Sequence, residues 1–204
     1  MSLCGDLLDY FINIMSGSTV SITDSLIINI LGSNSTGFQG FLYGENCIVL
    51  VNLTVFSMGI QGKTNLMRIQ KGKNLSIWNS EFNGNTNIKE ILLDFIEISK
   101  TIISNCFFHG NNMNYDNNDI YRPLIRLRDS EEVIIIKSVI VNNNCSSSGY
   151  FLEIEMESYS KIAIISSKFM KNQWLPFISI YNNNNGNSTN GLILLLNNTI
   201  TSSK

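Results

Sequence analysis

Hydrophobic and polar positions along this chain repeat with a period of close to 30 residues. The segment "IWNSEFNGN" at 77–85 returns as "ISNCFFHGN" at 103–111 and, less closely, as "IISSKFMKN" at 164–172. With the Phe of this motif as an anchor, equivalent apolar positions follow one another at intervals of 26 to 32 residues. The anchors are Ile27, Val55, Phe82, Phe108, Ile140, Phe169 and Ile200. A repeat of this length with strand-like patterns inside it predicts a solenoid, whose repeats stack to bury one continuous core.

Each repeat predicts three short strands. Seven and five residues before the anchor stand two apolar residues, such as Leu75 and Ile77, whose spacing of two puts them on one face of a strand. A similar pair lies 15 and 13 residues before the anchor, and the anchor itself lies in a third strand. Three residues before the anchor the chain favours polar residues. These are Asp24, Asn52, Asn79, Asn105, Lys137, Ser166 and Asn197. Because Asn tolerates the left-handed conformation of a sharp bend, this column predicts a corner at which stacked amides bond to one another.

The composition agrees with short strands joined by polar turns. The 204 residues include 30 Ile and 29 Asn but a single Ala, which is the best helix former. The sequence therefore predicts an all-β protein with one domain, residues 1–204, that forms a parallel β-helix of about seven coils.

The strand triplets and the Asn column resemble the right-handed parallel β-helix of the pectate-lyase-like superfamily over roughly residues 8–204. The F-x-x-N spacing is similar to that of polymorphic outer-membrane-type surface proteins, and occurs at Phe82/Asn85, Phe108/Asn111 and Phe169/Asn172. The Asn-rich, Ala-poor composition is similar to that of large surface proteins from protists with AT-rich genomes. These resemblances imply a single-stranded solenoid from an extracellular or cell-surface protein.

The net charge and the spacing of the cysteines argue against several classes of partner and ligand. The net charge of −2 without a basic cluster argues against nucleic acid. No apolar run approaches the ~20 residues of a membrane-spanning helix. The first residues lack a signal-peptide pattern, so we expect an excerpt of a longer chain or the loss of targeting residues. Cys4, Cys47, Cys106 and Cys145 lie far apart without a CxxC pair, so we expect no metal site and no cofactor.

One column of charged residues carries the strongest candidate chemistry. Fourteen residues before the anchor the chain reads Arg68, Asp94, Arg126 and Glu155. This position points outward from the first strand, and alternating charges on parallel rungs ~4.8 Å apart would pair along the stack. The resemblance to carbohydrate-active members of the fold implies the alternative, with Arg126 as a base or Asp94 and Glu155 as an acid pair. Alternating sign favours the ion-pair ladder.

Other candidate residues are isolated. The one histidine, His109, precedes Gly110 without the acidic motifs of polygalacturonase-like enzymes, and is expected to be a solvated side chain. Asp116 and Asp119, in "NYDNND", lack the spacing of a calcium loop. We therefore predict no catalytic and no metal-binding residue.

Six Asn-x-Ser/Thr sequons occur, close to the number that this composition gives by chance. Asn34, Asn144 and Asn187 lie in expected loops and are the best candidates for glycans, with Asn74 the next. Asn52 and Asn197 belong to the bend column, which we expect to point inward and to be unavailable.

The leading hypothesis is a non-enzymatic structural or adhesive segment of an extracellular or cell-surface protein. Its partners would be a copy of itself or further chain at the open ends of the β-helix, which could build a filament. The alternatives are a polysaccharide lyase or glycoside hydrolase that uses the outer face of the first strand, or a glycan-binding module. Such a module would use exposed aromatic rings as platforms, with candidates Tyr43, Trp78 and Trp174.

Overall fold

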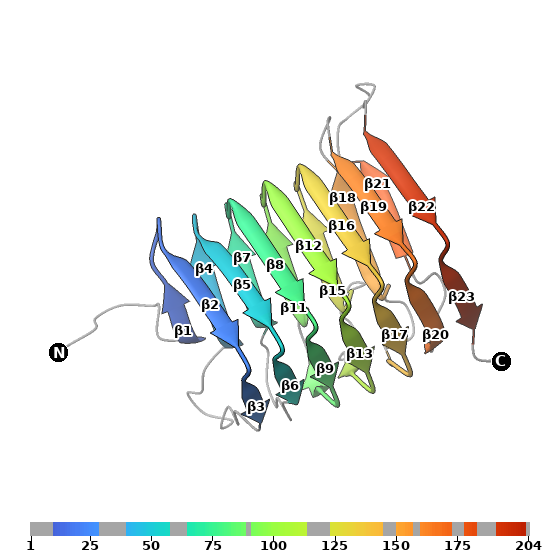
Figure 1. Ribbon diagram of the computed structural model, residues 1–204, viewed down its shortest axis with the longest axis horizontal. Helices are drawn as coiled ribbons and strands as arrows, with labels where there is room; N and C mark the ends of the chain where they lie inside the picture. Colours follow the sequence, from blue (N-terminus) through green and yellow to red (C-terminus); the bar gives the residue numbers. More distant parts are fainter. Residues whose placement is uncertain are drawn as a thin grey trace, which may run out of the picture.

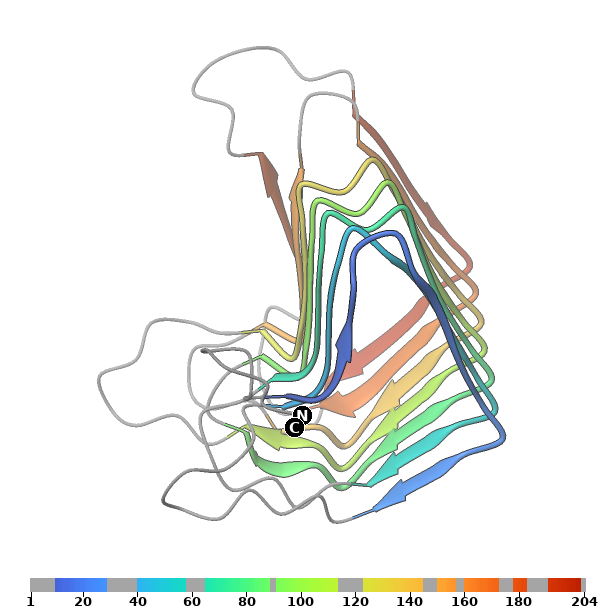
Figure 2. The ribbon, with the colours of Figure 1, turned by 90° about the vertical axis from the view of Figure 1, so that its left-hand side faces the viewer.

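In the computed structural model the chain coils into a parallel β-solenoid (Figure 1). The structure describes residues 10–28, 40–57, 65–88, 91–113, 123–144, 150–156, 160–172, 178–182 and 191–202, and none of these is helical. Viewed from the N-terminal end, the chain turns clockwise as it recedes, so the solenoid is right-handed (Figure 2). The prediction of an all-β parallel β-helix is therefore confirmed.

Three parallel sheets, each of seven strands, form the faces of the solenoid. The first sheet contains β1 (Tyr10–Ile14), β4 (Gly40–Glu45), β7 (Asn65–Gln70), β11 (Leu93–Ile96), β15 (Ile125–Arg128), β18 (Leu152–Met156) and β21 (Ile178–Asn182). The second contains β2 (Thr19–Thr23), β5 (Ile48–Asn52), β8 (Asn74–Trp78), β12 (Lys100–Ser104), β16 (Glu132–Ile136), β19 (Lys161–Ile165) and β22 (Leu192–Leu196). The third contains β3 (Leu26–Ile28), β6 (Val55–Ser57), β9 (Glu81–Asn83), β13 (Phe107–His109), β17 (Val139–Val141), β20 (Lys168–Asn172) and β23 (Thr199–Ser202).

Each coil contributes one strand to every sheet, so the count of about seven coils holds. We number the coils 1 to 7 from the N-terminus. A short two-stranded sheet of β10 (Thr86–Ile88) and β14 (Asn112–Met113) lies beside coils 3 and 4. Because every strand pairs with its equivalent one coil away, side chains stack in columns along the axis.

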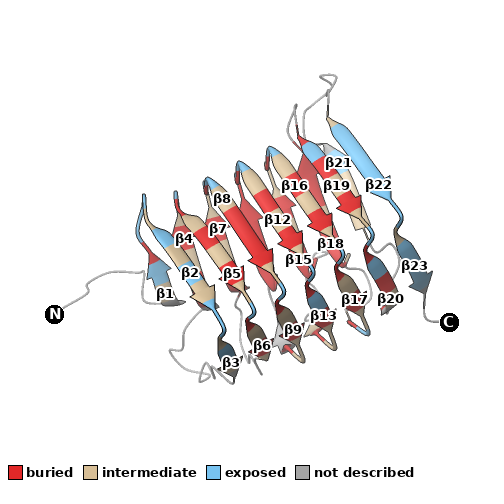
Figure 3. Cartoon of the chain, in the orientation of Figure 1, coloured by how far each residue is buried: buried red, intermediate tan, exposed pale blue. Residues whose placement is uncertain are grey.

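The core is a set of apolar columns that run the length of the solenoid. In the third sheet, the rings of Phe56, Phe82 and Phe108 stack with centroids 5.0 and 4.7 Å apart and planes within 11°. The column begins at Ile27 and continues through Ile140 and Phe169 to Ile200. Burial is complete in the middle coils and falls away at β22, which is pale blue in Figure 3. A long, narrow core of this kind is closed on three sides and open at its two ends.

The corner between the second and third sheets explains the polar column. Its residues have φ between 47° and 55° in all seven coils, which is the left-handed region. They are Asp24, Leu53, Asn79, Asn105, Lys137, Ser166 and Asn197. Amides stack along part of this corner: Asn105 donates to Asn79 over 2.7 Å, and Asn79 donates to Asn52 over 3.0 Å. The expected stacking is confirmed, and the expected bend residue is confirmed in six coils. In coil 2 the bend lies at Leu53 and not at Asn52.

The bend column points outward, which corrects the expectation that it faces the core. Asn79, Asn105 and Asn197 are exposed, while in coils 2 to 6 the residue after the bend is buried, as at Ser80 and Ser138. The reason is geometric: a left-handed residue reverses the course of the chain, and its Cβ lies on the convex side of the corner. Small side chains then fill the crowded concave side.

The Asn of the F-x-x-N motif forms a second ladder, and this one is buried. Asn85 and Asn111 are 0% exposed, and the ladder continues through Asn143 and Asn172. Each side-chain amide donates to the carboxamide oxygen of the next ladder Asn, over 2.7 to 3.0 Å. Each also donates to a backbone carbonyl of the preceding coil, as Asn111 does to Phe82. The motif recurs because buried amide groups need partners and the neighbouring coils supply them.

In coil 2 the register of the structure is shifted by one residue from the register that the sequence repeat predicts. The structure pairs Ile27 with Phe56 and Phe56 with Phe82, so the anchor is Phe56 and Val55 lies on the outer side. The interior residues of β5 are accordingly Val49 and Val51. The segment "IVLV" is apolar at every position, so it contains no alternation that could fix the register.

Candidate functional site

The predicted charge column lies on the outer face of the first sheet, on three consecutive coils. Asp94 pairs in register with Arg68 on one side and with Arg126 on the other. Arg126 clamps the Asp94 carboxylate with two hydrogen bonds, from Nε at 2.9 Å and from Nη2 at 3.0 Å. Arg68 lies on the opposite side, with its Nε 3.7 Å from Oδ2 of the same carboxylate. Two guanidinium groups therefore enclose one carboxylate whose side chain is only 1% exposed.

Glu155 does not belong to this column, which corrects the fourth predicted member. The register pairs Arg126 with Glu153, and Glu155 with Arg128. The physical cause is the connection between β18 and β19. From Leu127 in β15 to Val133 in β16 is six residues, whereas from Ile154 to Ile162, their partners in coil 6, is eight. A fixed offset from the anchor therefore picks the wrong glutamate.

The column continues toward coil 7 through an aromatic hydroxyl. Tyr181 donates from its hydroxyl group to Oε1 of Glu153 over 2.9 Å. Partial burial raises the pKa of Tyr181, and the hydrogen bond to Glu153 and the negative charges of Glu153 and Glu155 raise it further. Burial alone would lower the pKa of Arg126, but the hydrogen bonds and charge of Asp94 outweigh it and raise that pKa above its ordinary value. Both groups therefore keep their protons at neutral pH.

The charged side chains of this column are bonded to one another, which makes them poorly suited to act as a base or nucleophile. A base or nucleophile needs an accessible lone pair, and the Asp94 carboxylate is buried between two cations. His109 lies in β13 with its Nδ1 3.2 Å from Oδ1 of Asn83, and its ring stacks on Phe107 with centroids 5.6 Å apart. It is half-buried and bonded, not solvated as we expected.

The remaining aromatic candidates differ in their position relative to the charge column, and the acidic candidates fall outside the described residues. Tyr43 lies in β4, aligned with Arg68, and Trp78 lies on the outer face of the second sheet; both are half-buried. Trp174, Asp116 and Asp119 fall outside the described residues. No helix within the described ranges is long and apolar enough to cross a membrane.

Two of the four cysteines are described, and both are buried free thiols. Burial raises the pKa of Cys106 to about 11, and burial also raises the pKa of Cys47. Cys4 and Cys145 fall outside the described residues. Across the part of the chain that the structure describes, no three His, Cys, Asp or Glu side chains gather as metal ligands would.

The structure corrects the expectation for one of the sequons, Asn197. Asn197 is exposed on the outward bend, so its side chain is available to solvent. Asn52 is half-buried and its side-chain oxygen accepts a hydrogen bond from the side-chain amide of Asn79. Asn74 is half-buried and its side-chain oxygen accepts a hydrogen bond from the hydroxyl group of Ser76. Asn144 is half-buried and bridges to Asn112. Asn34 and Asn187 lie outside the described residues.

The C-terminal coil is the largest departure from a closed core. Ile193, Leu195 and Ile200 occupy interior columns, yet they are 46%, 58% and 55% exposed. Their partners in coil 6, Ile162, Ile164 and Phe169, are at most 1% exposed. The outward residues of the same strand, Leu192, Leu194 and Leu196, are also exposed. The last coil therefore presents a five-residue strand in which every residue is apolar and exposed.

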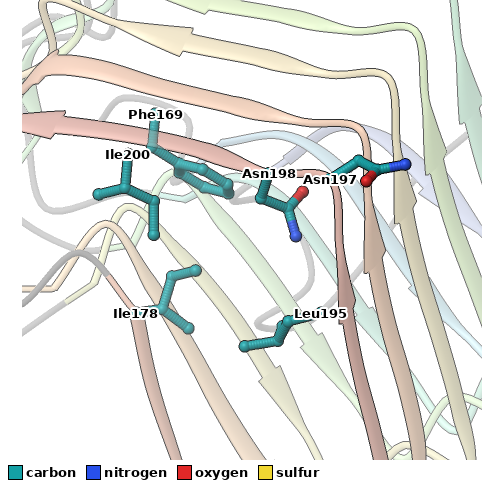
Figure 4. A pocket seen from close by; sticks show the side chains of 6 residues that line it. All are labelled: Phe169, Ile178, Leu195, Asn197, Asn198 and Ile200. Carbon is teal, nitrogen blue, oxygen red and sulfur yellow. The ribbon is translucent and has the colours of Figure 1, made fainter.

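A depression of about 290 Å³ opens at this end, between the three last strands. Figure 4 shows the side chains that line it, which are Phe169, Ile178, Leu195, Asn197, Asn198 and Ile200. The depression is the open end of the hydrophobic core, at the position that the interior side chains of a further coil would occupy. The sequence indicates the apolar character of this coil, because the segment "GLILLL" is apolar at five consecutive positions.

Comparisons of the chain with protein-family models, with curated proteins and with solved structures found no match. The features that characterise this chain are therefore those of its own structure: a right-handed parallel β-solenoid, two amide ladders, a closed charge column and an open apolar end.

Proposed function

We propose that the chain is a non-enzymatic structural or adhesive β-solenoid segment of an extracellular or cell-surface protein, and that it assembles with further β-structure at its ends. The observation that carries the proposal is the exposed C-terminal coil. An open sheet edge offers unpaired N–H and C=O groups to another strand, and soluble proteins usually block or cover such edges. Here the edge is combined with exposed interior side chains.

The free energy available at this end favours association. Burying one Leu or Ile side chain is worth roughly 1.5–3 kcal/mol, and three interior side chains of coil 7 are about half exposed. A contiguous apolar patch of this kind marks an interaction site more often than a free surface. Covering Ile193, Leu195 and Ile200 as their equivalents are covered inside the stack would therefore stabilise a contact.

The polar side chains that pair between coils support a structural role for the three sheets. The two amide ladders and the Asp94 column join side chains to equivalent side chains one coil away. Groups committed to such pairs hold the coils in register, which is what a spacer or fibre needs. The finer relationship, to the pectate-lyase-like superfamily or to outer-membrane-type surface repeats, is supported by the right-handed solenoid and by the F-x-x-N ladder.

A second candidate is a carbohydrate-active enzyme or a glycan-binding module on the outer face of the first sheet. It is favoured by Tyr181, which is partly exposed beside Glu153 and Arg126, because an aromatic ring next to charged hydrogen-bonding groups suits a sugar. For the structural proposal we expect no release of unsaturated or reducing sugars from polyuronates or neutral glycans. Turnover that disappears in the Arg126→Ala variant would instead establish the enzyme.

The extracellular assignment makes a separate prediction about sequons. In a chain expressed through a secretory pathway, Asn197 should be modified, since it is exposed on the bend. Asn52 should remain bare, because its side chain is half-buried and bonded to Asn79. Intact glycopeptide mass spectrometry distinguishes the two sites, and a modified Asn52 with a bare Asn197 would contradict this arrangement.

Assembly is tested by light scattering and negative-stain images of the wild-type chain and of two Leu→Lys variants. Leu195→Lys places a charge in the exposed end of the core. Leu53→Lys is the matched control, because Leu53 is similarly exposed, at 52%, but lies on the bend of coil 2. We expect association in the wild type and in Leu53→Lys, and its loss in Leu195→Lys. Association that survives Leu195→Lys would refute the C-terminal coil as the assembly surface.

A further inference from the structure

We infer that the occupant of the C-terminal coil is the N-terminal coil of a second copy of this chain, joined head to tail in the same register that links coils within one molecule. This inference rests on the proposed function and names the partner. It is carried by hydrogen-bonding groups at the corner between the second and third sheets. Those groups repeat from coil to coil, and among the described residues the pattern is incomplete in coil 1 and in coil 7.

The first repeating bond starts at the bend. In coils 1 to 6 the N–H of the bend residue donates to the carbonyl oxygen of the residue before the bend in the next coil, over 2.8 to 3.2 Å. Asn105 donates in this way to Ile136, and Ser166 donates to Leu196. In coil 7 the equivalent donor is the N–H of Asn197, and none of the described residues accepts it. The equivalent acceptor at the other end of the molecule is the carbonyl oxygen of Thr23, before the bend of coil 1.

The second repeating bond runs in the opposite direction. The donor is the N–H of the first residue of a third-sheet strand. The acceptor is the carbonyl oxygen of the residue directly after the bend in the preceding coil, at 2.8 to 3.0 Å. Val139 donates in this way to Cys106, and Thr199 donates to Ser167. At the N-terminal end the same N–H belongs to Leu26, and at the C-terminal end the same carbonyl belongs to Asn198. A second copy brings these two groups together.

The third bond involves a side chain and is the most specific. Cys106 and Ser138 each donate their backbone N–H to a serine Oγ in the next coil, at Ser138 and Ser167, over 3.2 Å. Both serines direct their own hydroxyl hydrogen to a carbonyl two residues earlier, which leaves a lone pair free to accept. Ser25 in coil 1 has the same arrangement, since its Oγ donates to the carbonyl of Thr23 over 2.8 Å.

Coil 1 therefore carries the acceptor of an internal coil. Among the described residues, no preceding coil donates an N–H to Ser25 Oγ. The group that would donate in the continued pattern is the N–H of Asn198. Three reciprocal bonds then link one corner of each copy: Asn197 to Thr23, Leu26 to Asn198, and Asn198 to the hydroxyl group of Ser25.

The apolar columns match as well. Continuing the columns places Val20 against Ile193, Ile22 against Leu195 and Ile27 against Ile200. The three residues of coil 1 pack against the core but are only partly buried, as the members of an open end should be. The second-sheet strands at the two ends, β2 and β22, are both five residues long. Because the joined surfaces differ, the contact does not close on itself and would extend into a filament.

A pair of variants that each block one end tests the inference. Leu26→Pro removes the N–H that would reach Asn198 of the preceding copy. Leu26 is exposed on the edge strand, where a proline whose N–H position faces outward is tolerated. Leu195→Lys blocks the other end. Each variant keeps one open surface, so each alone should remain monomeric.

Mixing the two variants should restore a single contact. In Leu26→Pro the C-terminal coil is intact, and in Leu195→Lys the N-terminal coil is intact, so the equimolar mixture should form a one-to-one dimer and nothing larger. Sedimentation velocity or native mass spectrometry measures this, with circular dichroism to show that both variants are folded. Leu53→Lys, which changes neither end, should assemble as the wild type does.

The outcomes separate this inference from the proposed function. A wild-type chain that stays monomeric would overturn both. If the wild type and Leu26→Pro assemble equally while Leu195→Lys does not, the C-terminal coil is an assembly surface but its partner is not coil 1, and only this inference fails. Two folded monomeric variants that give no dimer on mixing would overturn it as well.

Discussion

Asn111 donates a side-chain hydrogen bond to Oδ1 of Asn143 over 2.8 Å, between two buried residues that lie 32 positions apart in the sequence. The same oxygen of Asn143 accepts the backbone N–H of Asn111 over 3.1 Å. Asn111 in turn accepts two bonds from Asn85 through its own oxygen. One amide group thus connects three coils, and this is the physical content of the F-x-x-N repeat.

Removing one amide from the buried ladder should be costly. In Asn111→Ala the amide and N–H of Asn85 lose their acceptor, and the carbonyl of Phe82 loses a donor, all in the interior. Because unsatisfied buried polar groups cost about 1–3 kcal/mol each, we expect the free energy of unfolding to fall by about 2–4 kcal/mol. Urea denaturation measures this change.

The exposed ladder provides the control. Asn105→Gly removes the amide that bonds to Asn79 but keeps a residue that accepts the left-handed bend. Solvent replaces the lost bond, so the change should stay below about 1 kcal/mol. Equal losses in Asn111→Ala and Asn105→Gly would mean that burial of the ladder does not determine its contribution.

Burial should also decide the strength of the ion pairs. A double-mutant cycle on Asp94 and Arg126 should give a coupling energy of about 1.5–3 kcal/mol, because the Asp94 carboxylate is enclosed and hydrogen-bonded twice. Lys100 and Glu132 form a shorter contact of 2.7 Å, but both side chains are more than a third exposed. Their coupling should be only about 0.2–1 kcal/mol. A stronger coupling for Lys100–Glu132 than for Asp94–Arg126 would contradict this order.

Stability should depend on the protonation of Cys106 at alkaline pH. Burial raises the pKa of this thiol from 9.0 to about 11 in the folded chain. Between these values the unfolded chain loses the proton while the folded chain keeps it, so the free energy of unfolding falls as the pH rises through this window. The loss should approach about 2–3 kcal/mol above pH 11.

Cys106→Ser isolates this effect. Serine occupies the same column at Ser80 and Ser138, so the variant fits the corner without a titrating group. The wild type should lose more stability than Cys106→Ser between pH 9 and pH 11, by urea denaturation at each pH. Parallel pH profiles would show that the thiol does not titrate differently in the two states.

The sequence predicts the architecture well because strand periodicity and left-handed bends are local properties. Polar residues at a fixed distance before the anchor were sufficient to place six of the seven bends, five at Asn, Ser or Asp and one at Lys137. The seventh is at Leu53, next to the Asn52 that the pattern favoured. Leu has no preference for this conformation, so only the pairing with neighbouring coils places it there.

Side-chain partners were harder to predict than strands. Glu153 and Glu155 both lie on the outer side of β18, and only the length of the connection to β19 decides which one faces Arg126. The buried amide ladder was also missed, although its Asn residues were visible as a repeat, because a polar residue after a strand reads as a turn. Its burial depends on stacking between coils, which no single repeat contains.

Hydrogen exchange at the last coil, measured as a function of protein concentration, tests the central claim most directly. In a joined copy the N–H of Asn197 bonds to the next coil as its equivalents do within the molecule, and β22 becomes an interior strand. We predict that amide protection in residues 191–202 rises with concentration in the wild type and not in Leu195→Lys, while β12 remains protected throughout. Exchange in residues 191–202 that is fast and independent of concentration would contradict assembly through the C-terminal coil.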